Sequence, residues 1–223
     1  MMQKHKVIVF DLDDTLYKEI DFLKSAYREI ANFFCDQYGI YGLWGEMLRY
    51  YGEGKDVFQE LINLYNRDVT KDFLIEMYRN HMPEINLDDE TKCVLDYIKA
   101  NPTCSIGLIT DGREVTQTNK IDALGLLDYV DDTNIFISET WQHDKIDGFV
   151  CSMIEEMYPN CNYVYVGDNP QKDFLAPNQR GWDTICLLDN GRNIHKQVFD
   201  LAPDYLPKYR IRSMTDLKGI ISK

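Results

Sequence analysis

Three acidic residues stand close together directly after a short apolar run near the N-terminus. In the stretch VIVFDLDDTLY, residues 7–17, they are Asp11, Asp13 and Asp14. Neighbouring carboxylates repel one another, so such clustering requires a bound cation, a shared proton or exposure to solvent. The first two conditions describe a reactive site, and a solvated acidic turn is the alternative interpretation of this stretch alone.

Two later apolar runs also lead into residues that can act on an anionic group, and a lysine opens a predicted helix between them. These residues are Thr110, Asp111, Gly112, Lys145, Asp168 and Asp173. Together with the first acidic cluster they supply a nucleophile, an acid, a metal site and a positive charge. Transfer of a phosphoryl group from a monoester requires these four components.

The runs that lead into these residues are predicted to be strands of one sheet. They are rich in β-branched and aromatic residues, as strands covered on both faces are. The predicted strands are residues 7–10, 104–110, 134–138, 162–168 and 183–189, and the predicted helices between them are residues 88–100, 113–126, 144–158 and 171–181. This alternation predicts an α/β fold with a mainly parallel sheet, which binds ligands at the carboxyl ends of its strands.

Residues 17–85 have a different pattern and predict an inserted all-α domain. Helical stretches with dispersed aromatic residues are separated by glycines, and Pro83 helps to end the last of them. The predicted core therefore comprises residues 1–16 and 86–223, and both connections to the insert lie near the first acidic turn. That arrangement lets the insert cover the site as a lid, and the alternative is an insert that only adds buried surface.

Aromatic residues are frequent in this insert. They include Tyr27, Phe33, Phe34, Tyr41, Trp44, Tyr50 and Tyr51. We expect most of them to pack in the core of the insert, and one or two to face the cleft.

The composition restricts the classes of partner. The 223-residue chain has a formal net charge of -13, which opposes binding to nucleic acid or to an anionic membrane. Neither a membrane-spanning run of roughly 20 apolar residues nor a signal-peptide pattern is present, which predicts a cytoplasmic protein. The six cysteines are scattered without a C-x-x-C pair, so the sequence gives little support to a zinc or disulfide framework.

Four ordered motifs resemble those of the haloacid dehalogenase-like hydrolase superfamily, in the phosphatase branch whose helical cap follows the first motif. The first motif, D-x-D-x-T, matches residues 11–15, and the second, a strand ending in Thr or Ser, matches Thr110. The fourth, G-D-x-x-x-x-D, matches residues 167–173. The third requires a lysine, usually before proline, and is assigned to Lys145, which Ile146 follows here. The resemblance covers nearly the whole chain and implies a Rossmann-like three-layer core with an inserted cap.

The resemblance also implies roles for the acidic residues. Asp11 is expected to be the nucleophile that forms an acyl phosphate, and Asp13 the general acid and then the general base. Mg²⁺ is expected to bind the carboxylates of Asp11 and Asp168 and the backbone carbonyl of Asp13. Asp173 is expected to orient this metal site rather than to bind the ion.

The remaining residues of the four motifs are expected to bind the phosphoryl group. Thr110 offers its hydroxyl, Asp111 and Gly112 offer backbone amides, and Lys145 offers a positive charge. Three nearby residues receive no such role. Asp14 is interpreted as a solvated or turn-forming acid, Arg113 as a surface arginine at a helix end, and Lys120 as a weaker candidate than Lys145 inside a predicted helix.

The expected function is Mg²⁺-dependent hydrolysis of a small-molecule phosphate monoester through an aspartyl-phosphate intermediate. A phosphomutase uses the same core and stays open as an alternative. A dehalogenase is disfavoured because relatives with that activity lack an acid at the position of Asp13. A receiver-like phosphoacceptor protein is disfavoured by the large insert. Neither the particular substrate nor the oligomeric state is indicated by the sequence.

Overall fold

The computed structural model describes residues 4–65 and 68–222, and within them one sheet forms the centre of the core. Its six strands lie in the order β3-β2-β1-β4-β5-β6, and every neighbouring pair is parallel. The strands are β1 Lys6–Phe10, β2 Cys104–Thr110, β3 Ile135–Ile137, β4 Asn162–Gly167, β5 Asp183–Leu187 and β6 Tyr209–Ile211. The predicted α/β class with a parallel sheet is confirmed.

Strand β1 lies at the point where the strand order reverses. Phe10, the last residue of β1, pairs with Leu108 of β2 on one side and with Val166 of β4 on the other. This register places Asp11 between the ends of β2 and β4, so Thr110 and Asp168 flank it. A crevice at such a reversal is the usual ligand site of an open parallel sheet.

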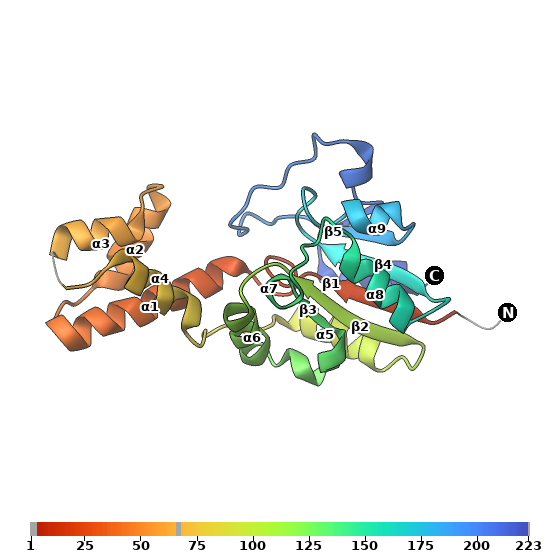
Figure 1. Cartoon of the computed structure of the whole chain (residues 1–223), viewed down its shortest axis with the longest axis horizontal. Helices are drawn as coiled ribbons and strands as arrows, with labels where there is room; N and C mark the ends of the chain where they lie inside the picture. The colour runs from red at the N-terminus through yellow and green to blue at the C-terminus, as the bar shows by residue number, and fades with distance from the viewer. Residues whose placement is uncertain (1–3, 66–67, 223) are drawn as a thin grey trace.

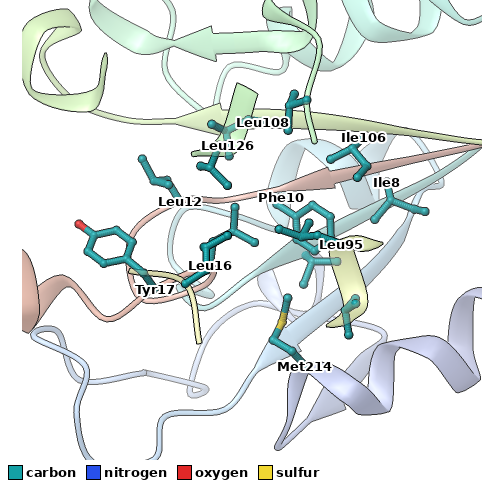
Figure 2. Close-up of a cluster of buried hydrophobic side chains, with 14 of the residues drawn as sticks. Ile8, Phe10, Leu12, Leu16, Tyr17, Leu95, Ile106, Leu108, Leu126 and Met214 are labelled. Atoms are coloured by element: carbon teal, nitrogen blue, oxygen red, sulfur yellow. The ribbon is translucent and has the colours of Figure 1, made fainter. Parts of the chain in front are cut away.

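Helices cover both faces of the sheet and produce the three layers. Successive residues of β1 point to opposite faces, so Ile8 and Phe10 belong to one apolar cluster while Val7 and Val9 belong to the other. Figure 2 shows part of the first cluster, where Leu95 of one helix packs near Phe10. The core helices are α5 Asp89–Lys99, α6 Glu114–Ala123, α7 Ser138–Trp141, α8 Phe149–Met157, α9 Leu175–Gln179 and α10 Leu217–Ile221, with short 3₁₀ turns at Leu126–Asp128, Asp132–Asn134, Pro203–Tyr205 and Met214–Asp216.

The insert consists of helices in its described part and has an apolar core of its own. It extends away from the sheet beyond the carboxyl end of β1 (Figure 1). Leu23, Ile30 and Phe34 of the first helix pack with Met47 and Leu61 of the following helices. The helices are α1 Glu19–Tyr38, α2 Leu43–Gly52, α3 Val57–Tyr65 and α4 Lys71–Asn80. We propose that the cap comprises residues 17–85 and the core residues 1–16 and 86–223; residues 1–3, 66–67 and 223 lie outside the described residues.

Three elements differ from the prediction. The helix predicted over residues 171–181 is confined to α9 Leu175–Gln179, because residues 171–174 form a turn and a bend and the side chain of Asn169 accepts the backbone N–H of Gln171. The helix predicted from residue 144 begins only at Phe149, because Gly148 has a φ of 74° and the Asp144 carboxylate accepts backbone N–H groups of Ile146 and Asp147. Lys145 therefore lies in a turn before the helix rather than at its start. Strand β6 was not predicted, because only three residues form it and just one of them, Ile211, is buried. No helix within the described ranges is both long enough and apolar enough to cross a bilayer.

Candidate active site

Asp11 follows β1 directly and is buried at the edge of the sheet. Its backbone N–H donates to the carbonyl of Val166 at 2.9 Å, which extends the pairing with β4 by one residue. Its carboxylate accepts hydrogen bonds from the Lys145 ammonium and, at 3.4 Å, from the Thr15 hydroxyl. Burial raises the pKa of Asp11 to about 8; Lys145 acts in the opposite direction and nearby Asp173 adds to the rise. A counter-cation beyond Lys145 is therefore needed to keep this carboxylate ionised at neutral pH.

Asp13 lies two residues further on and has a different environment. The ammonium of Lys120 lies 2.7 and 2.9 Å from its two carboxylate oxygens. The Tyr17 hydroxyl and the Gln117 amide donate to the same carboxylate, the latter at 3.0 Å. Burial acts to raise the pKa of Asp13, but Lys120 and these hydrogen bonds outweigh it and hold the pKa below its usual value. The two acids of the first motif are thus electrostatically distinct.

Asp11, Asp168 and Asp173 form a buried group of carboxylates. One oxygen from each lies within 4.8 Å of the others. Burial, followed by the charges of Asp11 and Asp173, raises the pKa of Asp168 to about 9. Oxygen ligands with excess negative charge are the donor set that hard divalent cations prefer. The residues present therefore fit Mg²⁺.

Asp173 differs from the other two acids in that protein donors already engage both of its oxygens. Lys145 donates to Oδ1 at 2.9 Å, and the backbone N–H of Asn169 donates to Oδ2 at 2.7 Å. This geometry supports the predicted orienting role over direct binding of the ion, although the three carboxylates are close enough to share one. Asp13 directs its carboxylate to Lys120, so its predicted contribution to the metal is limited to the backbone carbonyl.

Lys145 connects the nucleophile to Asp173. Its side chain is buried, and its ammonium contacts Asp11 as well as Asp173. Although burial disfavours a charged amine, the two carboxylates raise the pKa of Lys145 well above its usual value. The lysine assigned from the weakest of the four motifs therefore lies at the site as a permanent positive charge.

The other predicted phosphate-binding residues are only partly brought together. Thr110 and Asp111 line the same cavity as Asp11. The backbone N–H of Gly112 instead donates to the hydroxyl of Ser138 at 2.9 Å, and Gly112 is not among the residues that line the cavity. The structure therefore does not direct the Gly112 amide to a phosphoryl group.

Of the two interpretations that the sequence suggested for Asp14, a solvated or a turn-forming acid, the structure excludes the first and agrees with the second, because Asp14 lies in a turn. Only 3% of Asp14 is exposed, and its φ of 57° is unusual for a residue with a side chain. Its carboxylate accepts the backbone N–H of Glu19 at 3.1 Å and that of Ile194 at 3.0 Å. Asp14 thus fastens the first turn of α1 to a distant loop. Arg113, by contrast, is exposed next to the first residue of α6, as predicted.

Sequence reasoning missed the loop that follows β5, residues 188–208. Asn193 donates from its amide to the Asp168 carboxylate at 2.7 Å and accepts from the Lys18 ammonium at 2.7 Å. Arg192 donates to both carboxylate oxygens of Asp21 in α1 at 2.8 Å. This loop therefore connects the acidic group at the end of β4 to the base of the cap.

Sequence reasoning also underestimated Lys120 and did not consider Gln117. Both are buried on α6, where Gln117 lies one turn before Ile121 and Lys120 lies one turn before Leu124. The sequence did contain a signal for these two residues. They are polar, and they stand at positions where an amphipathic helix normally places apolar residues.

The cavity at this edge of the sheet is small and polar. It has a volume of about 140 Å³. Among the described residues, the lining contains seven acidic residues, two lysines, Thr110, Asn169 and His195, and Glu19 alone of these comes from a cap helix. No aromatic residue in the described part of the cap lines the cavity, contrary to the expectation that one or two would face it. Tyr27, Phe34 and Tyr50 are buried in the cap core, and Tyr41 is 81% exposed.

Residues 8–187 match the family model of the haloacid dehalogenase-like hydrolases. The chain therefore belongs to this family and is an enzyme of the hydrolase class. Among curated proteins it is similar to a glyceraldehyde 3-phosphate phosphatase of Methanocaldococcus jannaschii. The two are 25% identical over 230 residues, covering 97% of this chain and 96% of the relative.

Solved structures share the fold over almost the whole chain. A HAD-hydrolase from Bacillus subtilis bound to magnesium has a TM-score of 0.66 at 19% identity, with 99% of this chain and 100% of that chain covered. A 2-haloacid dehalogenase from Pseudomonas syringae has a TM-score of 0.64 at 19% identity, with 98% of each chain covered. Because hydrolases that act on different bonds share this fold, the activity must be argued from the site.

Proposed function

We propose that the chain is a Mg²⁺-dependent phosphatase that hydrolyses a small phosphate monoester through an aspartyl phosphate on Asp11. The contrast between Asp11 and Asp13 carries this proposal. Asp11 shares a buried acidic group with Asp168, whereas Asp13 is held by Lys120 on the other side. A dehalogenase needs no acid at Asp13, but expulsion of an alkoxide from phosphorus does.

The first step transfers the phosphoryl group to the protein. An Asp11 oxygen attacks phosphorus, the bond between phosphorus and the ester oxygen breaks, and Asp13 gives a proton to the departing oxygen. Because Lys120 holds the pKa of Asp13 below its usual value in the free site, Asp13 takes up this proton when the negatively charged ester binds beside it. Lys145 offsets the repulsion between the Asp11 carboxylate and the phosphoryl oxygens, and Thr110 is placed to donate its hydroxyl. Bound Mg²⁺, held by Asp11, Asp168 and the Asp13 carbonyl, would supply further positive charge for the phosphoryl group.

The second step releases phosphate. A water molecule attacks the phosphorus of the aspartyl phosphate, Asp13 accepts the proton of that water, and the bond to the Asp11 oxygen breaks. Asp11 is restored as a carboxylate, and Asp13 is again protonated for the next cycle. The hydrogen bonds from Lys120, Tyr17 and Gln117 fix the position of the Asp13 carboxylate for both proton transfers.

Two observations support a small substrate. The cavity of about 140 Å³ is below the size of a typical drug-sized ligand pocket. The curated relative is a phosphatase of the three-carbon compound glyceraldehyde 3-phosphate. A small-molecule partner rather than nucleic acid, and a cytoplasmic location, belong to the same proposal and accord with the net charge of -13.

Release of inorganic phosphate from a panel of esters tests this function. The panel contains phenyl phosphate, glyceraldehyde 3-phosphate, larger sugar phosphates and nucleotides, each with Mg²⁺ or with excess chelator. We expect Mg²⁺-dependent release from phenyl phosphate and the small esters. Release that is undiminished in chelator, or release from none of the esters, would contradict the proposal.

A further inference from the structure

The cavity carries far more negative than positive charge. Seven carboxylates line it, and Lys145 and Lys172 are the lysines that oppose them. Lys172 is half exposed, and its ammonium lies 3.6 Å from the carboxylate of Asp111, so the charge of Asp111 already balances part of the charge of Lys172. One divalent ion would still leave carboxylates in excess. A phosphate ester would therefore be held here by its phosphoryl group, through Lys145 and a bound metal ion, while its other end would meet a negative field.

Glu19 differs from most of the other acids in the cavity because no contact with a described residue balances its charge. It is the first residue of α1, and its carboxylate has no hydrogen-bond donor or ion-pair partner within the described ranges. Most of the other acids have a partner that balances or binds the carboxylate. Asp11 and Asp173 contact Lys145. Asp13 contacts Lys120, and Asp14 accepts two backbone N–H groups. The charge of Glu19 is left uncompensated by direct contacts.

The place of Glu19 in the fold puts it on the leaving-group side of the reaction. Among the described residues that line the cavity, Glu19 is the one from a cap helix, and that helix extends away from the sheet beyond the carboxyl end of β1 (Figure 1). In an in-line displacement the leaving oxygen lies opposite the nucleophile, so it points away from Asp11 and the sheet and toward the cap. In accord with a position beside the other acids, burial raises the pKa of Glu19 to about 7, and among charged neighbours Asp13 contributes most to the rise. Glu19 therefore faces the part of the substrate that departs, not the phosphoryl group that is transferred.

We propose that Glu19 is a specificity-determining residue that excludes phosphate esters with a second negative charge on the leaving group. The site then takes monophosphates of small, uncharged polyhydroxy alcohols or hydroxyaldehydes. Phosphorylated acids, bisphosphates and nucleoside diphosphates are rejected. The carboxylate of Glu19 can also accept a hydrogen bond from a hydroxyl of such a leaving group. This inference rests on the proposed phosphatase activity and adds a substrate class to it.

A pair of esters matched in size tests the inference. Glyceraldehyde 3-phosphate and 3-phosphoglycerate differ only in an aldehyde or a carboxylate at the end remote from the phosphate. We measure kcat/KM for both with Mg²⁺ at about pH 8.5, where Glu19 is ionised. The wild-type protein should prefer the aldehyde by on the order of tenfold or more, as expected for one unscreened like charge nearby.

Glu19→Gln removes the charge with little change in shape, and should reduce this preference several-fold by raising kcat/KM for 3-phosphoglycerate. Glu29→Gln is the matched control, because Glu29 is an exposed residue of the same helix that does not line the cavity. The control should leave the preference unchanged while altering the net charge equally.

The outcomes separate this inference from the proposed function. Equal turnover of the two esters by the wild-type protein, or a preference that Glu19→Gln changes only by slowing the aldehyde, would overturn the inference alone. Hydrolysis of phenyl phosphate without hydrolysis of either three-carbon ester would also overturn the inference but not the phosphatase proposal. If phenyl phosphate is not hydrolysed either, the phosphatase proposal fails and the inference fails with it.

Discussion

The ammonium of Lys120 lies within 3 Å of both carboxylate oxygens of Asp13, at 2.7 and 2.9 Å. Only 4% of the lysine side chain is exposed, and its ammonium also lies 4.4 Å from the centre of the Phe22 ring. A buried lysine with two such contacts holds its partner in one position. Helix α6 therefore contributes to the chemistry by fixing the residue proposed to move protons.

Lys120→Met should impair the transfer of protons by Asp13 more than the binding of phosphate. For an alkyl phosphate, whose leaving group needs a proton, we expect kcat to fall on the order of a hundredfold with KM changed little. For phenyl phosphate the loss should be much smaller, because phenolate leaves without an acid. Lys120→Arg should restore part of the alkyl phosphate activity. Equal losses for both esters, or no rescue by arginine, would indicate a merely structural lysine.

Mg²⁺ should stabilise the protein more strongly at high pH than at low pH. Without metal the folded pKa values of Asp11 and Asp168 are raised to about 8 and 9 from an ordinary value of 3.8. Between about pH 4 and pH 9 the folded state therefore binds more protons than the unfolded state, so its free energy of unfolding falls as pH rises. Mg²⁺ competes with those protons and replaces their stabilising effect.

Thermal melting with and without saturating Mg²⁺ measures this dependence. The increase in Tm should be larger at about pH 9 than at about pH 6. Asp168→Asn should remove most of the Mg²⁺-dependent increase at both values. An increase that is the same at both pH values in the wild-type protein would contradict the assignment of Asp11 and Asp168 as metal-binding carboxylates.

Asn193→Ala should weaken Mg²⁺ binding without abolishing catalysis. Its amide donates to the Asp168 carboxylate at 2.7 Å and thereby fixes the orientation of a proposed metal ligand. Loss of such a donor typically costs about 10–100-fold in metal affinity. Titration of activity with Mg²⁺ should show this rise in the half-saturating concentration, with kcat at saturation largely retained. Asn190→Ala in the same loop is the control and should leave the Mg²⁺ titration unchanged.

The strand ends were predictable from sequence because each functional residue there is next to an apolar run in the chain. Asp11 follows β1, Thr110 ends β2 and Asp168 follows β4, and a parallel sheet brings such ends together. Lys145 was found by its motif, but its placement at a helix start was wrong because turns at Asp144 and Gly148 delay α8.

The contributions of Lys120 and Asn193 were not predictable in the same way. Lys120 is 107 residues from Asp13 in the chain, and its contact depends on how α6 packs beside the sheet. Asn193 lies in an irregular loop without periodicity, 25 residues from Asp168. The absence of cap aromatics from the cavity follows from packing as well, since the separate apolar core of the cap buries several of them.

The most direct test of the account is detection of the phosphoryl group on Asp11. Asp13→Asn lacks the base that activates water, yet an aryl phosphate can still phosphorylate Asp11 because phenolate is a good leaving group. Rapid mixing of this variant with an aryl phosphate and Mg²⁺, followed by acid quenching, should give a burst of about one phenolate per site. Intact-protein mass spectrometry should show one added phosphoryl group, and peptide analysis should assign it to Asp11. The same experiment with Asp11→Asn should give neither burst nor added mass. A burst without a phosphoryl group on Asp11, or turnover that persists in Asp11→Asn, would contradict the account.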